Sequence, residues 1–295
     1  MKKVILFIIC FYAHTLSAQI HSTDGGMSAY RKIVKDDYGQ ASLTAYYKID
    51  FLKDSTQRGN YSEAQCVLQI SDNYLCFGDY HQLIADSLEI EFKRNRKSRT
   101  QANSDLWDNA VLKVAFRTKV ITDLQAQTIR AQVFTGLKDY EYSAPQPLLQ
   151  WNLVAGDSII NDLPCKKAVC RYAGREYTAW YAESMPMPYG PYIFNGLPGL
   201  IMKIQDTKGN WIFTNNGISK NRGCKDMYLY KKGFISGEVK TTTREKALEA
   251  LRNETENFSN LMVEVCGLKE LRNGVWVTPE ANNPREPSNL IELEW

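Results

Sequence analysis

The chain has 295 residues, of which 44% are hydrophobic and 23% are charged, and its mean hydropathy is −0.39. No apolar run approaches the ~20 residues of a membrane-spanning helix, which argues against an integral helical membrane protein. Aromatic residues make up 12% of the chain, more than disordered proteins usually carry, so we expect a folded protein with a sizeable core.

The first 18 residues have the pattern of a secretory signal peptide. Lys2 and Lys3 form a positive end, residues 4–13 are mostly apolar, and small residues follow at 16–18. Removing them lowers the formal net charge from +3 to +1. We therefore expect an exported protein, periplasmic, outer-membrane associated or secreted, in which residues 19–295 form a single β-rich domain.

Loss of the signal peptide leaves six cysteines and two histidines, His21 and His81. Six is an even number, and exported proteins fold where thiols can pair, so up to three disulfides are candidates, in pairings the sequence does not specify. The alternative is that several are buried thiols. The six are Cys66, Cys76, Cys165, Cys170, Cys224 and Cys266.

In chain order, the first predicted elements are antiparallel strands within residues 30–77, separated by polar turns at 53–60 and 71–73. Looser apolar spacing predicts a helix or long loop over 83–107, and the strand pattern returns at 111–116. Five of the seven residues at 93–99 are basic. Because the mature net charge is only +1 and no nucleic-acid motif is present, we interpret them as a solvated face and expect no nucleic-acid partner.

Residues 165–172 and 175–181 are two β-rich runs on either side of Ala173-Gly174, which predicts a hairpin with Arg171 opposite Glu176. If the first strand is regular, Cys165 and Cys170 point to opposite faces and do not bond each other. Prolines and glycines then crowd residues 186–199, so this segment is an extended connection, with a type II turn predicted at 197–200.

A second hairpin is predicted from the alternating strand at 200–205, the turn at 206–210 and the strand at 211–214. A helix over 244–258 follows, with Thr242 and Glu245 as its capping box. Residues 261–266 and 275–278 are predicted to be short strands. The remaining residues, from 279 on, are polar and rich in turns.

An ordered set of short motifs links these two hairpins. Within residues 151–214 they are Cys165-Lys-Lys-Ala168, Gly174-Arg175-Glu-Tyr177-Thr-Ala179-Trp180-Tyr181, Tyr189-Gly190-Pro191 and Gly196-Leu197-Pro198-Gly199-Leu200-Ile201. This set closely resembles the GLPGLI family, which is named for its hexapeptide and occurs in exported proteins of Bacteroidetes. The resemblance implies a β-rich envelope or secreted protein without an established activity, whose members are associated with outer-membrane uptake systems.

The resemblance also implies the fold: a mainly β protein with a strongly curved antiparallel sheet, an open barrel or bowl, to which the pattern adds one C-terminal helix and minor helical insertions. The motif residues have either a structural or a binding role. Tyr181, Tyr189, Tyr192 and Trp211 are candidates for a concave surface that stacks on a ligand.

Catalytic and metal sites find little support in the sequence. A Ser-His-Asp site needs an oriented histidine, only His81 is placed for it, and no G-x-S-x-G elbow is present. Asp206 and Glu183 flank the proline-rich loop as a weak carboxylate pair. Met185 and Met187, where the resemblance predicts aliphatic residues, suggest a Cu(I) site only if other ligands converge on them; packing is the favoured reading.

We therefore expect a non-enzymatic protein without a cofactor that binds or scaffolds beside an outer-membrane system. Two alternatives stay open. One is a binding protein that holds a lipid, glycan, peptide or copper in a concave sheet, and the other is a hydrolase.

Overall fold

The computed structural model describes residues 34–94, 110–135, 138–220, 225–233, 237–266, 270–272, 275–277 and 283–294. The predicted signal peptide, Cys224, the side chain of Cys266 and the basic residues 95–99 lie outside the described residues.

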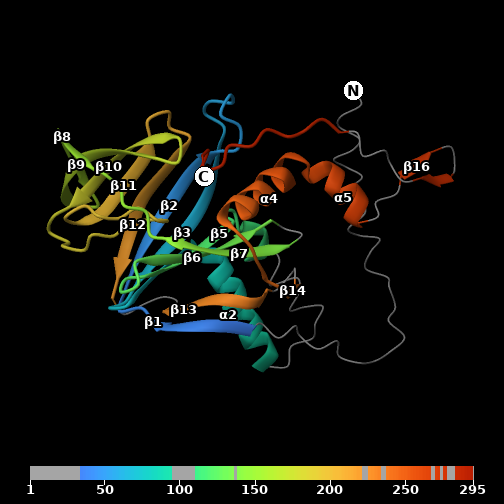
Figure 1. Cartoon of the computed structure of the whole chain (residues 1–295), viewed down its shortest axis with the longest axis horizontal. Coiled ribbons are helices and arrows are strands. Elements are labelled where there is room, and N and C mark those ends of the chain that lie inside the picture. Colours follow the sequence, from blue (N-terminus) through green and yellow to red (C-terminus); the bar gives the residue numbers. More distant parts are fainter. Residues whose placement is uncertain are drawn as a thin grey trace. The chain divides into compact units, whose positions relative to one another are not determined.

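A sheet of twelve strands dominates the structure (Figure 1). All of its neighbours pair antiparallel except β15 and β7, which pair parallel. In spatial order the strands are β15 (Lys240–Thr241), β7 (Asp139–Pro145), β6 (Thr128–Phe134), β5 (Thr118–Asp123), β4 (Tyr74–Asp79), β3 (Tyr61–Ile70), β2 (Leu43–Leu52), β12 (Trp211–Ser219), β11 (Leu200–Asp206), β10 (Arg175–Ala182), β9 (Leu163–Tyr172) and β8 (Asn152–Ile160).

One face of this sheet carries the main core. In β2, Ala45, Tyr47, Ile49 and Phe51 are buried at every second position, while the residues between them point to the other face. The same core includes buried side chains from β3 to β7 and from β9 to β12. Aromatic rings fill it, and Phe213 lies within 6.4 Å, centroid to centroid, of Phe77, Phe116 and Phe194.

A second layer covers the opposite face over β3 to β6. It consists of the helix α2 (Tyr80–Arg94) and a small sheet of β1 (Val34–Gln40), β13 (Asp226–Gly233) and β14 (Gly237–Glu238). Met227 and Leu229 of β13 pack on Cys76 and Ile121 of the large sheet. The face of β9 to β12 has no such helix among the described residues.

Two helices follow the sheet in the chain, α4 (Arg244–Glu256) and α5 (Phe258–Cys266), and a two-stranded ribbon of β16 (Glu270–Arg272) and β17 (Val275–Val277) comes after them. Ala247, Leu248 and Leu251 form the buried face of α4, because they recur at helical spacing. No helix in the described part of the chain has the length and apolarity that crossing a membrane requires.

Several predicted elements are confirmed. The hairpin of β9 and β10 places Arg171 opposite Glu176, and the hairpin of β11 and β12 turns at 207–210. The helix α4 begins at the predicted residue, although its N-cap is Thr243, whose side chain accepts from the Lys246 amide, and not Thr242. The mainly β class is confirmed, but the sheet is mixed, is not closed into a barrel, and is followed by two helices, not one.

Two predicted strands are wrong. Residues 111–113 form a short 3-10 helix, η2 (Val111–Lys113), and the amides of Ala115 and Phe116 donate to a carboxylate oxygen of Asp79, both at 2.9 Å, so no neighbouring strand receives them. The apolar run 261–266 belongs to α5, because a short apolar run has no periodicity that separates strand from helix.

The predicted type II turn at 197–200 is wrong as well. Such a turn needs a positive φ at Gly199, but in this loop the positive φ values belong to Tyr192 and Gly196, at 60° and 92°. The Gly199 amide instead donates to the Leu197 carbonyl at 2.8 Å, closing a three-residue turn around Pro198.

Candidate functional site

The tip of the β9–β10 hairpin carries a buried arginine. Ala173 (φ 44°) and Gly174 (φ 79°) both adopt the left-handed conformation that tight hairpin turns require. Arg175 follows at 6% exposure. A buried guanidinium needs partners, and its Nη1 lies 3.4 Å from a carboxylate oxygen of Asp206, which is 2% exposed.

The other partners of Arg175 come from the C-terminal segment, residues 289–294, which we call the tail. Its Nη2 donates to the carbonyl of Leu290 at 2.5 Å and to Oδ1 of Asn289 at 2.7 Å, and its Nε donates to the carbonyl of Ile291 at 3.1 Å. The hydroxyl of Tyr177 donates to the same Ile291 carbonyl at 3.1 Å. The motif arginine therefore holds a segment more than 100 residues away in the sequence.

The β12 strand and the end of β2 make the remaining hydrogen bonds to Asn289. The indole Nε1 of Trp211 donates to the Asn289 carbonyl at 3.0 Å, and Nδ2 of Asn289 donates to the Leu52 carbonyl at 2.7 Å. Three consecutive tail carbonyls, those of residues 289, 290 and 291, thus each accept from a buried side chain. The tail ends beside these strands in Figure 1.

A second buried charge lies one residue further along the tail. Glu292 is 1% exposed, and its carboxylate accepts from the Tyr192 hydroxyl and from the Arg244 guanidinium. Tyr192 has φ 60°, an uncommon backbone conformation for a bulky residue. Burial, together with the charge of Glu292, raises the pKa of Tyr192 well above its usual value.

The aromatic residues expected to face a ligand lie in the core instead. Tyr181, Tyr192 and Trp211 are 1%, 4% and 8% exposed, so they line no open concave surface. Tyr189 is half-buried and forms an isolated bridge with Asn195. Nothing in the sequence around these aromatic residues distinguishes a core that they fill from a concave surface that they would leave open to a ligand.

The Pro/Gly motifs shape the loop that precedes β11. A Cβ added at Gly199 would lie 2.2 Å from the Ala182 carbonyl oxygen, and one at Gly190 would lie 2.7 Å from Cδ1 of Ile201. Leu197 is fully buried, and Pro191 is buried as well. The hexapeptide thus serves close backbone packing.

Met185 and Met187 lie in the same loop and are half-buried against the main core, which is the packing that we favoured for them. In the described part of the chain, no three of His, Cys, Asp and Glu come together as a metal site. Asp206 and Glu183 have separate partners, Arg175 for the first and Lys166 for the second.

Four cysteines are described, and all four are buried and free: Cys66, Cys76, Cys165 and Cys170. Cys165 and Cys170 both belong to the main core cluster and both are free, so the prediction that they do not bond each other is confirmed. Burial raises the pKa of Cys170 to about 12.

The exposed face of β9 to β11 carries the third motif residue, Trp180. It stands directly opposite Lys167 on β9 and Lys203 on β11. The two ammonium groups lie 5.8 Å and 5.3 Å from the centroid of its ring, within the reach of cation–π attraction. Among the described residues, neither lysine has an ion pair, and all three side chains are only partly buried.

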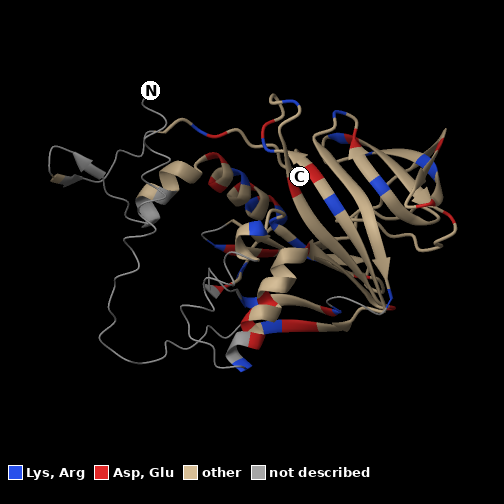
Figure 2. Ribbon diagram, turned by 180° about the vertical axis from the view of Figure 1, so that it is seen from behind, with Lys and Arg blue, Asp and Glu red and all other residues tan. Residues whose placement is uncertain are grey.

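This arrangement continues along one row across the sheet. From β8 to β3 the residues in register are Val154, Lys167, Trp180, Lys203, Thr214, Lys48 and Gln65. Lys48 is neutralised by Asp50 and Glu63, at 3.0 and 2.8 Å. Figure 2 shows basic positions on neighbouring strands of this part of the sheet. The unpaired positive charge of the row is therefore centred on Trp180.

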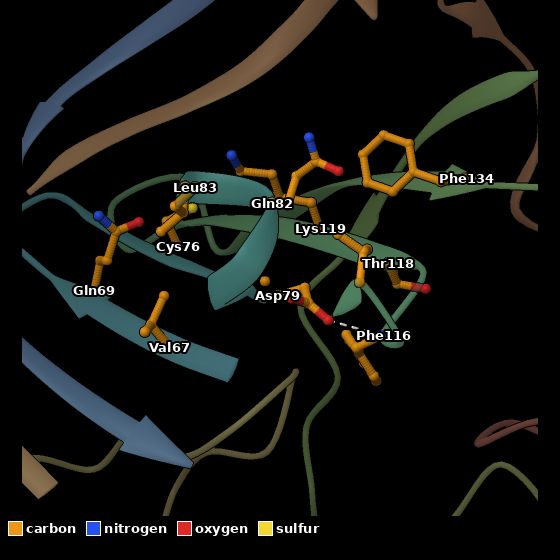
Figure 3. A pocket seen from close by; sticks show the side chains of 12 residues that line it. Val67, Gln69, Cys76, Asp79, Gln82, Leu83, Phe116, Thr118, Lys119 and Phe134 are labelled. Carbon is orange, nitrogen blue, oxygen red and sulfur yellow. Dashed lines mark hydrogen bonds between the residues drawn. The ribbon is translucent and has the colours of Figure 1, made fainter. Parts of the chain in front are cut away.

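A small pocket lies beneath α2 (Figure 3). Its volume of about 10 Å³ is room for one water molecule. Asp79 lies at its wall, and its carboxylate also accepts from the His81 amide at 2.8 Å, so this acid begins the helix and anchors residues 115–116. His81, the histidine considered as a catalytic base, has its Nδ1 3.6 Å from the same carboxylate, which here has a structural role.

Two buried charged residues lie near this pocket: Lys119 lines it, and Asp86 lies on α2. The Lys119 ammonium lies 3.5 Å from the centroid of the Tyr228 ring. Asp86 of α2 accepts from the hydroxyls of Tyr228 and Tyr230 and pairs with Lys35 at 3.4 Å. These contacts attach α2 to β13, and sequence reasoning did not single out any of these residues.

Comparison with known proteins assigns no activity. A family model described as "Protein of unknown function (Porph_ging)" matches residues 69–203, which include the β9–β10 hairpin and the hexapeptide. No curated protein matches the chain.

Two of the similar solved structures are described as PNGF-II in the P21 and C2 space groups. They are 12% and 11% identical to this chain, with TM-scores of 0.47 and 0.45. The alignments cover 74% and 72% of this chain, which spans only about a third (34% and 33%) of theirs.

Proposed function

We propose that the chain is an exported, non-enzymatic protein of the cell envelope that binds a partner of an outer-membrane system through the exposed face of β8 to β11. The observation that carries this proposal is Trp180 between Lys167 and Lys203. Tryptophan is the residue most enriched at the energetic centres of interfaces, and the two lysines favour an anionic partner surface.

The rest of the motif supports a binding role by what it already does. The polar groups of Arg175, Tyr192 and Trp211 make hydrogen bonds to the tail. Gly190 and Gly199 allow the close packing of neighbouring chain segments. The Trp180 side chain remains partly exposed and has no hydrogen bond among the described contacts. A partner on this face therefore needs no rearrangement of the core.

The edge strand β8 extends the same surface. Val154, in the row of Trp180, is 39% exposed, and two further apolar residues of this strand, Leu153 on the opposite face and Ile159, are 64% and 75% exposed. Exposed apolar side chains on an edge strand favour contact with another protein. The irregular pairing between Val154 and Ser158, with Gly156 at φ 126°, keeps the strand from being a flat template for aggregation.

The test is affinity isolation of the tagged mature chain from native membranes in mild detergent. We expect a reproducible outer-membrane partner with the wild-type chain and about a tenfold lower recovery with Trp180→Ala, as for other interface tryptophans. Phe258→Ala is the matched control, because Phe258 is an exposed aromatic residue (41%) on α5. Equal recovery with both variants, or no reproducible partner, would overturn the proposal.

A further inference from the structure

The hydrogen bonds that hold the tail are those of a peptide-binding groove. The groove contacts three consecutive main-chain carbonyls, which any peptide offers, and only two tail side chains make polar contacts with it, those of Asn289 and Glu292. Recognition by main-chain hydrogen bonds with a few side-chain pockets is how proteins commonly bind extended peptides.

The family model covers most of the residues that form the groove but none of the tail that fills it. Gly174, Arg175, Tyr177 and Tyr192 lie within the matched residues 69–203, whereas the whole tail lies outside them. The matched domain therefore contributes most of the groove, and the segment that fills it comes from elsewhere in the chain.

The backbone of the hairpin tip adds a main-chain contact to the tail. The amides of Leu293 and Glu294 donate to the Ala173 carbonyl at 3.0 and 3.4 Å. A Cβ at Gly174 would lie 3.0 Å from the Glu294 side chain and 3.1 Å from Leu293, so the glycine leaves the space in which the tail lies. The side chains of Leu293 and Glu294 themselves are exposed.

The charges of the groove specify the kind of peptide. Asp206 already balances Arg175, at 3.4 Å, but Arg244 is balanced by Glu292 of the tail. When the tail leaves, Arg244 becomes a partly buried cation without its carboxylate partner. A peptide with an Asn and, three residues later, a carboxylate would restore the contacts that Asn289 and Glu292 make.

The Ile291 side chain is 9% exposed and belongs to the main core cluster. From these contacts we infer that the groove is a binding site for an extended acidic peptide of the pattern Asn-x-Ile-Glu, which the tail occupies in cis and which a peptide supplied in trans can replace. This site is separate from the exposed face of β8 to β11. Because the tail competes for the groove, a trans peptide binds with an apparent affinity reduced by the fraction of grooves that are closed.

The experiment uses the full mature chain and a fluorescently labelled peptide of residues 286–295, with binding followed by fluorescence anisotropy. Glu292→Gln in the chain weakens the cis tail, so we expect the wild-type peptide to bind this variant at least about tenfold more tightly than it binds the wild-type chain. A peptide carrying Asn289→Ala and Glu292→Gln should not bind. A peptide with Glu294→Gln, changed at an exposed side chain, should bind as the wild-type peptide does.

A second measurement is independent of whether the Glu292→Gln chain folds. Saturating the wild-type chain with unlabelled peptide should speed hydrogen exchange of the Leu293 and Glu294 amides in the protein, while exchange within β10 stays unchanged. Equal binding of the wild-type and double-variant peptides, or no binding together with unchanged tail exchange, would overturn the inference. Partner recovery through Trp180 is unaffected by either result, so the two proposals fail separately.

Discussion

The Nε of Arg175 donates to the Ile291 carbonyl at 3.1 Å, although the two residues lie 116 positions apart. The arginine stands at a hairpin tip where a solvent-exposed residue is the ordinary expectation. The tail covers it instead, so the same side chain closes a hairpin, balances Asp206 and fixes the C-terminal segment.

Arg175→Met should lower the free energy of unfolding by about 3–5 kcal/mol, because it leaves the Asp206 carboxylate buried without its cation. Denaturant unfolding of both proteins measures the difference. Arg171→Met on the same hairpin is the control; Arg171 is exposed, and its loss should cost within about 0.5 kcal/mol. Similar losses for both variants would show that the buried pair contributes nothing beyond the hairpin itself.

Gly199→Ala should destabilise the protein by about 1–3 kcal/mol, the usual cost of overpacking. The new Cβ would lie 2.2 Å from the Ala182 carbonyl oxygen, a backbone atom that cannot turn aside. Gly217→Ala is the matched control, since its nearest atom is 3.8 Å away and its φ is not positive. Thermal unfolding compares the two, and an unchanged midpoint for Gly199→Ala would contradict the close approach.

Stability should fall at alkaline pH. Burial raises the pKa of Tyr47, Tyr142 and Tyr177 above the usual value near 10, because the phenolate is disfavoured in the core. These tyrosines titrate more readily in the unfolded chain, so their contribution is complete below about pH 10 and is lost as the pH rises beyond it. Unfolding midpoints between neutral pH and pH 11, together with tyrosinate absorbance, test this. Tyrosinate that forms at the same pH in native and denatured protein would contradict the burial of these phenols.

The described thiols should resist alkylation in the native protein. Cys66, Cys76 and Cys170 are buried, and burial raises the pKa of each, so little thiolate forms at pH 8. Iodoacetamide treatment followed by peptide mass spectrometry resolves each site, with the denatured protein as the control for full labelling. Rapid native labelling of Cys170 would contradict its place in the core.

The hairpins and α4 could be predicted because their signals are local. Alternation of apolar residues and the Ala173-Gly174 pair define β9 and β10, and the spacing of Ala247, Leu248 and Leu251 defines the helix, although its cap was predicted one residue too early, at Thr242. The strand predicted at 111–116 was wrong for the opposite reason. The partner of those amides is the Asp79 carboxylate, more than 30 residues earlier, and no neighbouring residue indicates it.

By itself, the sequence determined the β class, the two motif hairpins and the rigid proline-rich loop. Only the tertiary structure decided what the side chains of these elements touch. It buried Tyr192 and Trp211, placed Trp180 between two lysines, and brought Asn289 and Glu292 into the groove around Arg175. The physical reason is separation: hydrogen bonds between residues about 50 to 240 positions apart leave no periodic trace in a sequence, whereas turns and strands are encoded by neighbours.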